Sequence, residues 1–180
     1  LKHAIGALEE LAKFEPDEDA VIACILHHVL KEKRMTLQEL EEQFGPKVRS
    51  LVSGLHLLTY VTLEGRRSSI EDLRLVLLSV SDDVRVILIT LCTWTYVLRF
   101  LDRVAPEQAR RMCRDMLQLF APVAARLGIY TLKHDLESGA FPFVYPDDAL
   151  QIQEQMEQVH EDHVNFLARA QASLEAFFKE

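Results

Sequence analysis

Two adjacent histidines carry the clearest chemical signal in this sequence. His27 and His28 directly follow an uninterrupted apolar run over residues 20–26. Imidazole is a common ligand of transition metals, whereas a hard divalent cation prefers carboxylates, which supply both an oxygen ligand and negative charge. The pair therefore raises the question of whether the chain holds a metal site or only the remnant of one.

The other histidines and the cysteines suggest no second site. Four further histidines have no ligand partner at useful spacing: His56, His134, His160 and His163. The i,i+3 pair formed by the last two fits a solvated face of a polar helix. Three isolated cysteines lie in apolar settings without a CxxC pair: Cys24, Cys92 and Cys113. We interpret them as reduced thiols of the core in a cytoplasmic protein.

Composition excludes several classes of protein. The 180 residues suffice for one domain, which would bury ~70% of its unfolded surface. The longest apolar runs span about seven residues, whereas a membrane span needs ~20, and no secretory signal is visible. A formal net charge of −8 argues against general nucleic-acid binding. We therefore expect no membrane association and no direct contact with nucleic acid.

The spacing of apolar residues is helical almost throughout, and no β-hairpin signal such as Asn-Gly is present. The expected helices span residues 16–31, 36–44, 46–58, 68–80, 82–101, 106–127, 131–139 and 147–179. The fold class is therefore all-α, a compact bundle of about seven to nine helices with a long C-terminal helix. That last helix is polar and amphipathic, which fits either an exposed terminal helix or a connector to another domain.

Local signals mark several helix boundaries. Thr36 with Glu39, and Ser68 with Glu71, each form a capping box at the start of a helix. Gly128 fits the C-cap of the helix expected over residues 106–127, because glycine adopts a left-handed conformation without a steric penalty.

Beyond the histidine pair, several segments resemble the N-terminal hydrolase-type domain of the RelA/SpoT family, the enzymes that make and degrade guanosine tetra- and pentaphosphate. Residues 36–48, 51–55 and 83–89 follow the family's pattern in order and spacing. The most specific match is A-P-V-A-A-R-L-G-I over residues 121–129, with Leu132-Lys133 and Asp135-Leu136-Glu137 after it, which is similar to the family signature APLAxRLGI…LKxELE. The resemblance covers nearly the whole chain and implies an HD-domain-like helical bundle.

The resemblance also implies where a metal site would lie. Active members of the family hold a manganese ion with an early His, a His-Asp pair and a late Asp. In this chain those ligands fall on His3, His27, His28 and Thr93. An acidic pair that serves water activation in the active members falls on Lys31 and Glu32.

By the same comparison, the site has lost its chemistry. Both carboxylates that would neutralise the cation are replaced, and Lys31 cannot accept a proton while it is charged. An Arg and a nucleotide-contacting Asn of the family become Trp94 and Val97, which would fill the pocket of a polyanion with apolar bulk. We expect no catalytic residue, no bound metal and no cofactor in this chain.

A softer metal is an alternative. His3, His27 and His28 could hold zinc, which accepts three imidazoles and a water. Adjacent side chains on a helix lie ~100° apart, however, so both members of the pair can face one ion only if the helix ends there. We expect instead that His28 caps the helix or is partly exposed, and that His3 and His27 are packed polar residues of the core.

The leading functional hypothesis follows from the resemblance. It implies a catalytically inactive, hydrolase-like regulatory domain of a guanosine tetra- and pentaphosphate synthetase, a GTP pyrophosphokinase similar to the synthetase-only members and acting in the stringent response. Residues 1–145 would form the degenerate HD domain, and residues 146–180 a helix leading toward a synthetase domain outside this sequence. The expected partners are that synthetase domain and, through other parts of a longer protein, the ribosome. The expected location is the cytoplasm.

Two other functions stay open at this stage. The chain could be a residual metal-dependent hydrolase of the 3′-pyrophosphate, since His3 and His27 are retained. It could also sense a guanine nucleotide without turnover, with Arg99 near the former pocket. If it does neither, Arg99 faces solvent or pairs with Asp102 or Glu32.

Overall fold

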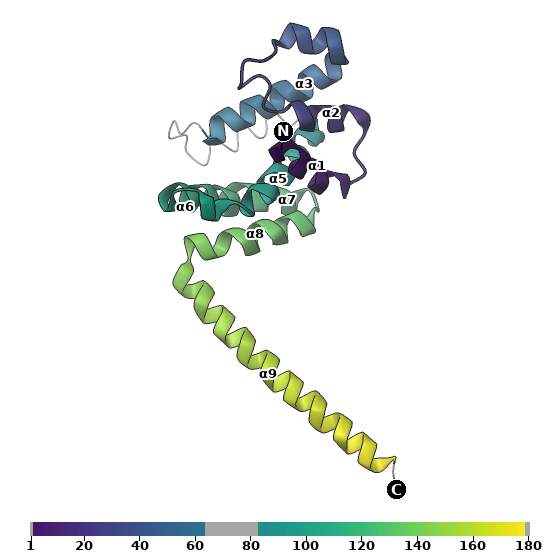
Figure 1. Ribbon diagram of the computed structural model, residues 1–180, viewed down its shortest axis with the longest axis vertical. Helices are drawn as coiled ribbons and strands as arrows, with labels where there is room; N and C mark the ends of the chain where they lie inside the picture. The colour runs from purple at the N-terminus through teal and green to yellow at the C-terminus, as the bar shows by residue number, and fades with distance from the viewer. Residues whose placement is uncertain (1, 64–82, 179–180) are drawn as a thin grey trace. The chain divides into compact units, whose positions relative to one another are not determined.

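The computed structural model describes residues 2–63 and 83–178, and within these residues all regular structure is helical (Figure 1). The all-α fold class is thereby confirmed. The chain divides into two compact units, Leu1–Ala140 and Phe141–Glu180. The helix expected over residues 68–80, with its Ser68–Glu71 capping box, lies outside the described residues. In the described part of the chain, no helix is both long and apolar enough to cross a membrane.

The helices of the first unit are α1 (Lys2–Ala12), α2 (Glu18–Leu26), α3 (Leu37–Leu63), α5 (Val84–Leu98), α6 (Pro106–Asp115), α7 (Ala121–Arg126) and the greater part of α8 (Tyr130–Val144). A 3₁₀ turn at Leu101–Arg103 precedes α6, and a π-helical turn at Met116–Phe120 joins α6 to α7. The second unit contains α9 (Pro146–Phe177). The assignment of residues 1–145 to one domain and of residues 146–180 to a connector stays a prediction.

The packing of α1 against α5 and α2 organises the centre of the first unit (Figure 1). Gly6 permits the α1–α5 contact, because a Cβ added at this position would lie only 1.9 Å from Cε2 of Tyr96. The buried side chains Leu11, Ala23 and Ile89 come from all three helices. This arrangement brings the start of α1 and the end of α2 to the same part of the unit.

Side-chain caps start two of the helices as the local signals predict. The Thr36 amide donates to Glu39 Oε2 at 2.7 Å, and the Glu39 amide donates to Thr36 Oγ1 at 3.2 Å. The predicted capping box is therefore confirmed. Asp83 caps α5 by accepting a hydrogen bond at 3.0 Å from the Arg85 amide.

Two glycines with positive φ mark breaks between helical segments. Gly45 has φ +86° and interrupts α3 immediately before Pro46, so the two helices expected on either side of it are joined across a kink. Gly128 has φ +74°, and beyond it the Ile129 amide donates to the Ala124 carbonyl at 2.9 Å. The predicted glycine C-cap is confirmed.

Three predicted helix ends are wrong. The helix expected over residues 46–58 continues to Leu63 at the end of α3. The helix expected to reach about residue 31 ends at Leu26, and residues 27–35 form turns and a bend. The helix expected to stop by Gly139 continues through Pro142 to Val144. Tertiary packing explains this continuation, since the buried face of α8 extends to Ala140 and a Cβ at Gly139 would lie 2.7 Å from Leu98 Cδ1.

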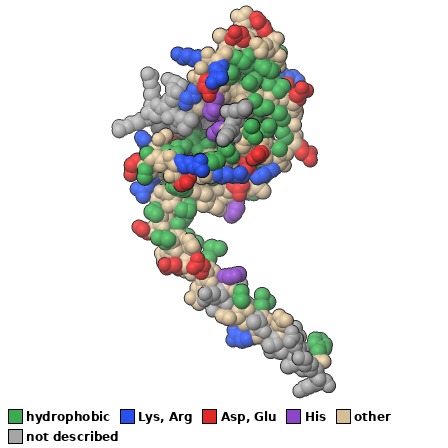
Figure 2. Space-filling view, viewed as in Figure 1, with side chains coloured by type: hydrophobic (Ala, Val, Ile, Leu, Met, Phe, Trp, Pro, Cys, Tyr) green, Lys and Arg blue, Asp and Glu red, His purple; other side chains and the backbone are tan. Residues whose placement is uncertain are grey.

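The second unit is a long helix with exposed apolar side chains. Leu150, Met156 and Phe166 are each more than 60% exposed. Figure 2 shows hydrophobic side chains at the surface along this helix, among acidic and other polar groups.

Candidate functional site

Three histidine side chains form a cluster in the first unit. His3 comes from α1, and His27 and His28 follow the last residue of α2. One ring nitrogen from each lies within 4.8 Å of those of the other two. The ring centroids are 3.9 Å apart for His27 and His28, 5.4 Å for His3 and His27, and 5.2 Å for His3 and His28.

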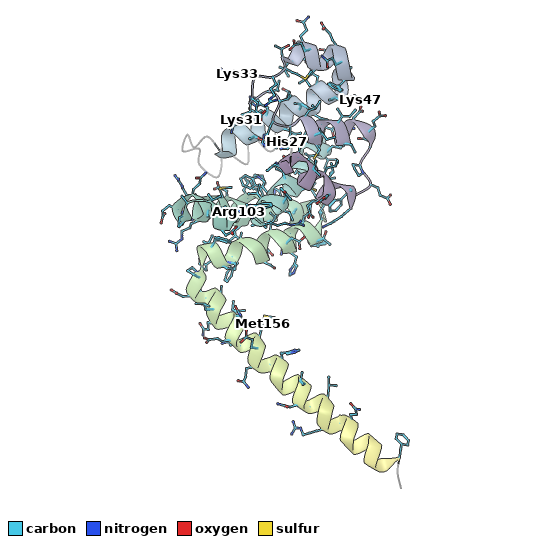
Figure 3. All side chains as sticks on the ribbon, viewed as in Figure 1. His27, Lys31, Lys33, Lys47, Arg103 and Met156 are labelled. Carbon is cyan, nitrogen blue, oxygen red and sulfur yellow. The ribbon has the colours of Figure 1, made fainter. Side chains whose placement is uncertain are left out.

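The early end of α2 explains why two adjacent histidines face the same point. His27 occupies the C-cap position, and His28 already lies in the turn that follows. Regular α-helical hydrogen bonding therefore ends at this pair, although His27 itself keeps φ −58° and ψ −20°. A ligand shared by both side chains requires the helix to end here, and it does. Figure 3 labels His27 next to α1, and Lys31 farther along the chain.

One hydrogen bond fixes the tautomer of His27. Its Nδ1 lies in hydrogen-bond contact with the backbone carbonyl of Cys24. A carbonyl oxygen can only accept, so Nδ1 carries the proton and Nε2 keeps its lone pair. His27 is buried, whereas His3 and His28 are half-buried.

Three buried ring nitrogens in the cluster have no hydrogen-bond partner among the described residues: His3 Nδ1, His27 Nε2 and His28 Nδ1. A buried polar atom without a partner costs about 1–3 kcal/mol of stability. The cluster is therefore an unfavourable arrangement unless something compensates for it.

The cluster is uncharged at neutral pH. Burial lowers the pKa of all three imidazoles, and it is the largest cause for each. The pKa of His28 falls to about 4, because His27, His3 and Lys31 add to the effect of burial. For His27, the bond to Cys24 acts in the opposite direction and does not outweigh burial.

A cavity of about 90 Å³ adjoins the cluster. Its walls are mainly apolar or threonine side chains: His3, His28, Leu55, Thr59, Thr90, Thr93, Trp94, Val97 and Met112. The Thr93 hydroxyl donates to the Ile89 carbonyl at 2.7 Å. Trp94 is 6% exposed, and its ring centroid lies 5.4 Å from that of Phe120. The structure thus brings Thr93, Trp94 and Val97 to one wall beside His3 and His28.

Lys31 and Glu32 are not part of this group. Both are exposed in the turns after α2, and the Glu32 carboxylate pairs with Arg34 at 2.6 Å. Among the described residues, the only group of histidine, cysteine or acidic side chains suited to hold a metal contains the three imidazoles and no carboxylate.

Arg99 has a partner that the sequence analysis missed. Its guanidinium pairs with the carboxylate of Glu10, which is 1% exposed and also pairs with Lys13. Arg99 is exposed, as expected, but its partner is Glu10 and neither Asp102 nor Glu32, because the packing of α1 against α5 brings Glu10 to it. A signal existed, since Glu10 follows Ala7 at i+3 on the buried face of α1.

The donor set does not fit the manganese ion that the family resemblance implies. Manganese prefers oxygen ligands, and carboxylates offset its charge. The three neutral nitrogens supply neither, and the Thr93 hydroxyl already donates to a backbone carbonyl.

Comparisons with known proteins identify the domain type and several relatives of this chain. A family profile described as HD domain matches residues 1–130. The guanosine-3′,5′-bis(diphosphate) 3′-pyrophosphohydrolase of Haemophilus influenzae is 31% identical over 147 residues, which are 81% of this chain and 22% of that protein. The bifunctional (p)ppGpp synthase/hydrolase SpoT of Escherichia coli is 32% identical over 148 residues, 82% of this chain and 21% of that protein.

A further similar protein is named for synthesis. The GTP pyrophosphokinase rsh of Brucella suis is 27% identical over 178 residues, 98% of this chain and 24% of that protein. The chain thus spans about a fifth to a quarter of the length of these relatives.

Proposed function

We propose, since the chain belongs to the HD-domain family and within it to the RelA/SpoT family, that it acts in guanosine tetra- and pentaphosphate metabolism without hydrolysing these nucleotides. In this proposal it is a regulatory domain of a longer protein, a GTP pyrophosphokinase of the stringent response. It works by contact with the synthetase domain of the same polypeptide, in the cytoplasm, while other parts of that protein engage the ribosome.

The observation that carries this proposal is the absence of a carboxylate from the histidine cluster, within the described residues. The two positions that resemble the family's acidic ligands hold His28 and Thr93. A polyphosphate hydrolase must offset the charge of its cation and provide a general base. Lys31 is a cation, and the Glu32 carboxylate pairs with Arg34.

The adjoining cavity supports the same conclusion. Its volume of about 90 Å³ is far below the ~300–1,000 Å³ typical of ligand pockets. Among the described residues that line it there is no Lys or Arg, although a polyanion requires cationic partners. Arg99, the cation that could have served a nucleotide sensor, pairs with Glu10 instead. As lined by the described residues, the cavity beside the histidine cluster therefore lacks the size and charge that residual hydrolysis or nucleotide sensing would need there.

Regulation by contact needs a surface and only a small energy. A differential affinity of ~1–3 kcal/mol between two states of a neighbouring domain suffices. The exposed apolar side chains of α9, such as Met156 and Phe166, offer such a surface.

Restoring the acidic ligands tests why the site is inactive. We expect the double variant His28→Asp, Thr93→Asp to bind manganese, measured by titration calorimetry, while the unchanged chain does not. A matched double variant, His28→Asn, Thr93→Asn, introduces side chains of the same size as aspartate without the charge. It should not bind manganese. Manganese binding by the unchanged chain would contradict the proposal, and failure of the aspartate variant would contradict its electrostatic basis.

The regulatory part is tested in the longer protein. We expect Met156→Glu with Phe166→Glu to change the rate of pyrophosphate transfer to GTP, because both place charge on the proposed contact. Gln151→Glu adds a charge at another exposed position of α9 and serves as the control. Equal rates in the unchanged protein, the double variant and the control would contradict the regulatory role.

A further inference from the structure

We propose that His3, His27 and His28 form a three-imidazole site for zinc, a borderline transition metal, which ties the start of α1 to the end of α2. The inference goes beyond the proposed function, since it assigns a structural metal to a domain that does not hydrolyse. The zinc ion would take the place of an oxygen-bound manganese ion, which this donor set does not fit.

The distances suit a tetrahedral nitrogen site. In such a site Zn–N bonds of about 2.0–2.1 Å place the nitrogen ligands roughly 3.3 Å apart. The candidate ligand atoms lie within 4.8 Å of one another, so they need to approach by no more than about 1.5 Å. His3 and His28 are half-buried at the edge of the cavity, which leaves room for their rings to turn.

The hydrogen bond to Cys24 prepares His27 as a ligand. Metal-bound histidines commonly donate their second ring N–H to a carbonyl or carboxylate, which fixes the tautomer and the ring orientation. Here Nδ1 donates to the Cys24 carbonyl, and the metal-binding Nε2 is buried without a partner.

The unpartnered nitrogens are an independent sign of a missing ligand. His3 Nδ1 and His28 Nδ1 are also buried without a hydrogen-bond partner in the described part of the chain. A cation bound by all three nitrogens would satisfy each of them at once. No proton has to be displaced near neutral pH, since the three imidazoles are already neutral.

The fourth position has space as well. Zinc held by three protein ligands usually takes a water as its fourth ligand, and the cavity of about 90 Å³ beside His3 and His28 can hold such a small non-protein ligand. Two neutral imidazoles from the turn after α2 and one from α1 would then form a crosslink between the two segments.

Metal selectivity tests the proposal directly. The 180-residue chain is stripped with a chelator and titrated separately with zinc, cobalt(II) and manganese. We expect one equivalent of zinc to bind and to raise Tm, cobalt(II) to give the visible absorption of a four-coordinate ion, and manganese to have neither effect. Equal binding of manganese, or no visible cobalt band, would overturn the proposal.

A ligand variant and a matched control locate the site. His28→Asn should weaken zinc binding by about tenfold or more, whereas His134→Asn, at an exposed histidine outside the cluster, should leave it unchanged. Zinc binding that survives His28→Asn in a folded protein, as judged by circular dichroism, would overturn the assignment. Pyrophosphate release by the zinc-loaded chain would instead contradict the proposed function and leave the zinc site standing.

Discussion

His27 donates its Nδ1–H to the carbonyl of Cys24, three residues earlier in the last turn of α2. That bond uses a carbonyl at the end of the helix and turns the other ring nitrogen toward His3 and His28. This one local hydrogen bond at the end of α2 therefore helps to orient His27 within the histidine cluster. The same residue types at the same spacing would not meet if α2 continued.

Gly6 sets the distance between α1 and α5. Because a Cβ at this position would meet the Tyr96 ring at 1.9 Å, we expect Gly6→Ala to lower the free energy of unfolding by about 1–3 kcal/mol. Urea denaturation followed by circular dichroism measures the change. The cost should shrink in a Tyr96→Ala background, where the ring is gone. An undiminished cost there would show that the contact is not its cause.

Arg99 should matter for stability because it offsets a buried charge. Arg99→Met leaves the Glu10 carboxylate with Lys13 alone. We expect a loss of about 1–3 kcal/mol, less than for a fully buried pair because Arg99 is exposed. Combining it with Glu10→Gln should recover part of the loss, as measured by chemical denaturation. A fully additive loss would contradict the ion pair.

Acidification should destabilise the metal-free protein through His28. Burial, and then the neighbouring His27 and His3, lower the pKa of His28 from 6.5 to about 4. Between those values the unfolded chain binds a proton at this position and the folded protein does not, so stability falls as the pH drops from 6.5 toward 4. With chelator present, the loss in unfolding free energy from about pH 7.5 to about pH 5 should be larger for wild type than for His28→Asn. Equal losses of unfolding free energy in wild type and His28→Asn would contradict the lowered pKa of His28.

The three cysteines should resist modification in the folded protein. Burial raises the pKa of Cys24 and of Cys113 to about 11, and that of Cys92 to about 12. At about pH 8 a thousandth or less of each thiol is then ionised, and the thiolate is the reactive form. A colorimetric thiol reagent should detect three cysteines in denaturant and react slowly without it. Rapid labelling of the native chain would mean that a thiol is accessible.

The elements predicted well are those whose signals are local. The reciprocal bonds of Thr36 and Glu39 and the positive φ of Gly128 depend on nearby atoms, and both were predictable from residue type. The ends of α2 and α8 were not, because packing between helices decides them. Pro142 lies inside a helix whose buried face continues to Ala140.

The candidate site was predictable as a set of residues but not as a geometry. The resemblance to the RelA/SpoT family identified His3, His27, His28 and Thr93, and the structure brings the three histidines together beside Thr93. The turn after Leu26 and the Glu10–Arg99 pair depend on contacts between distant segments, which no residue spacing reveals.

The most direct test of the central claim is pyrophosphate release from guanosine tetraphosphate by the 180-residue chain with manganese present. The matching segment of the Haemophilus influenzae pyrophosphohydrolase serves as the positive control. We predict no release above the rate without protein, because no carboxylate joins the three imidazoles within the described residues. Sustained release that is abolished by His27→Ala would contradict the account and identify the chain as a hydrolase.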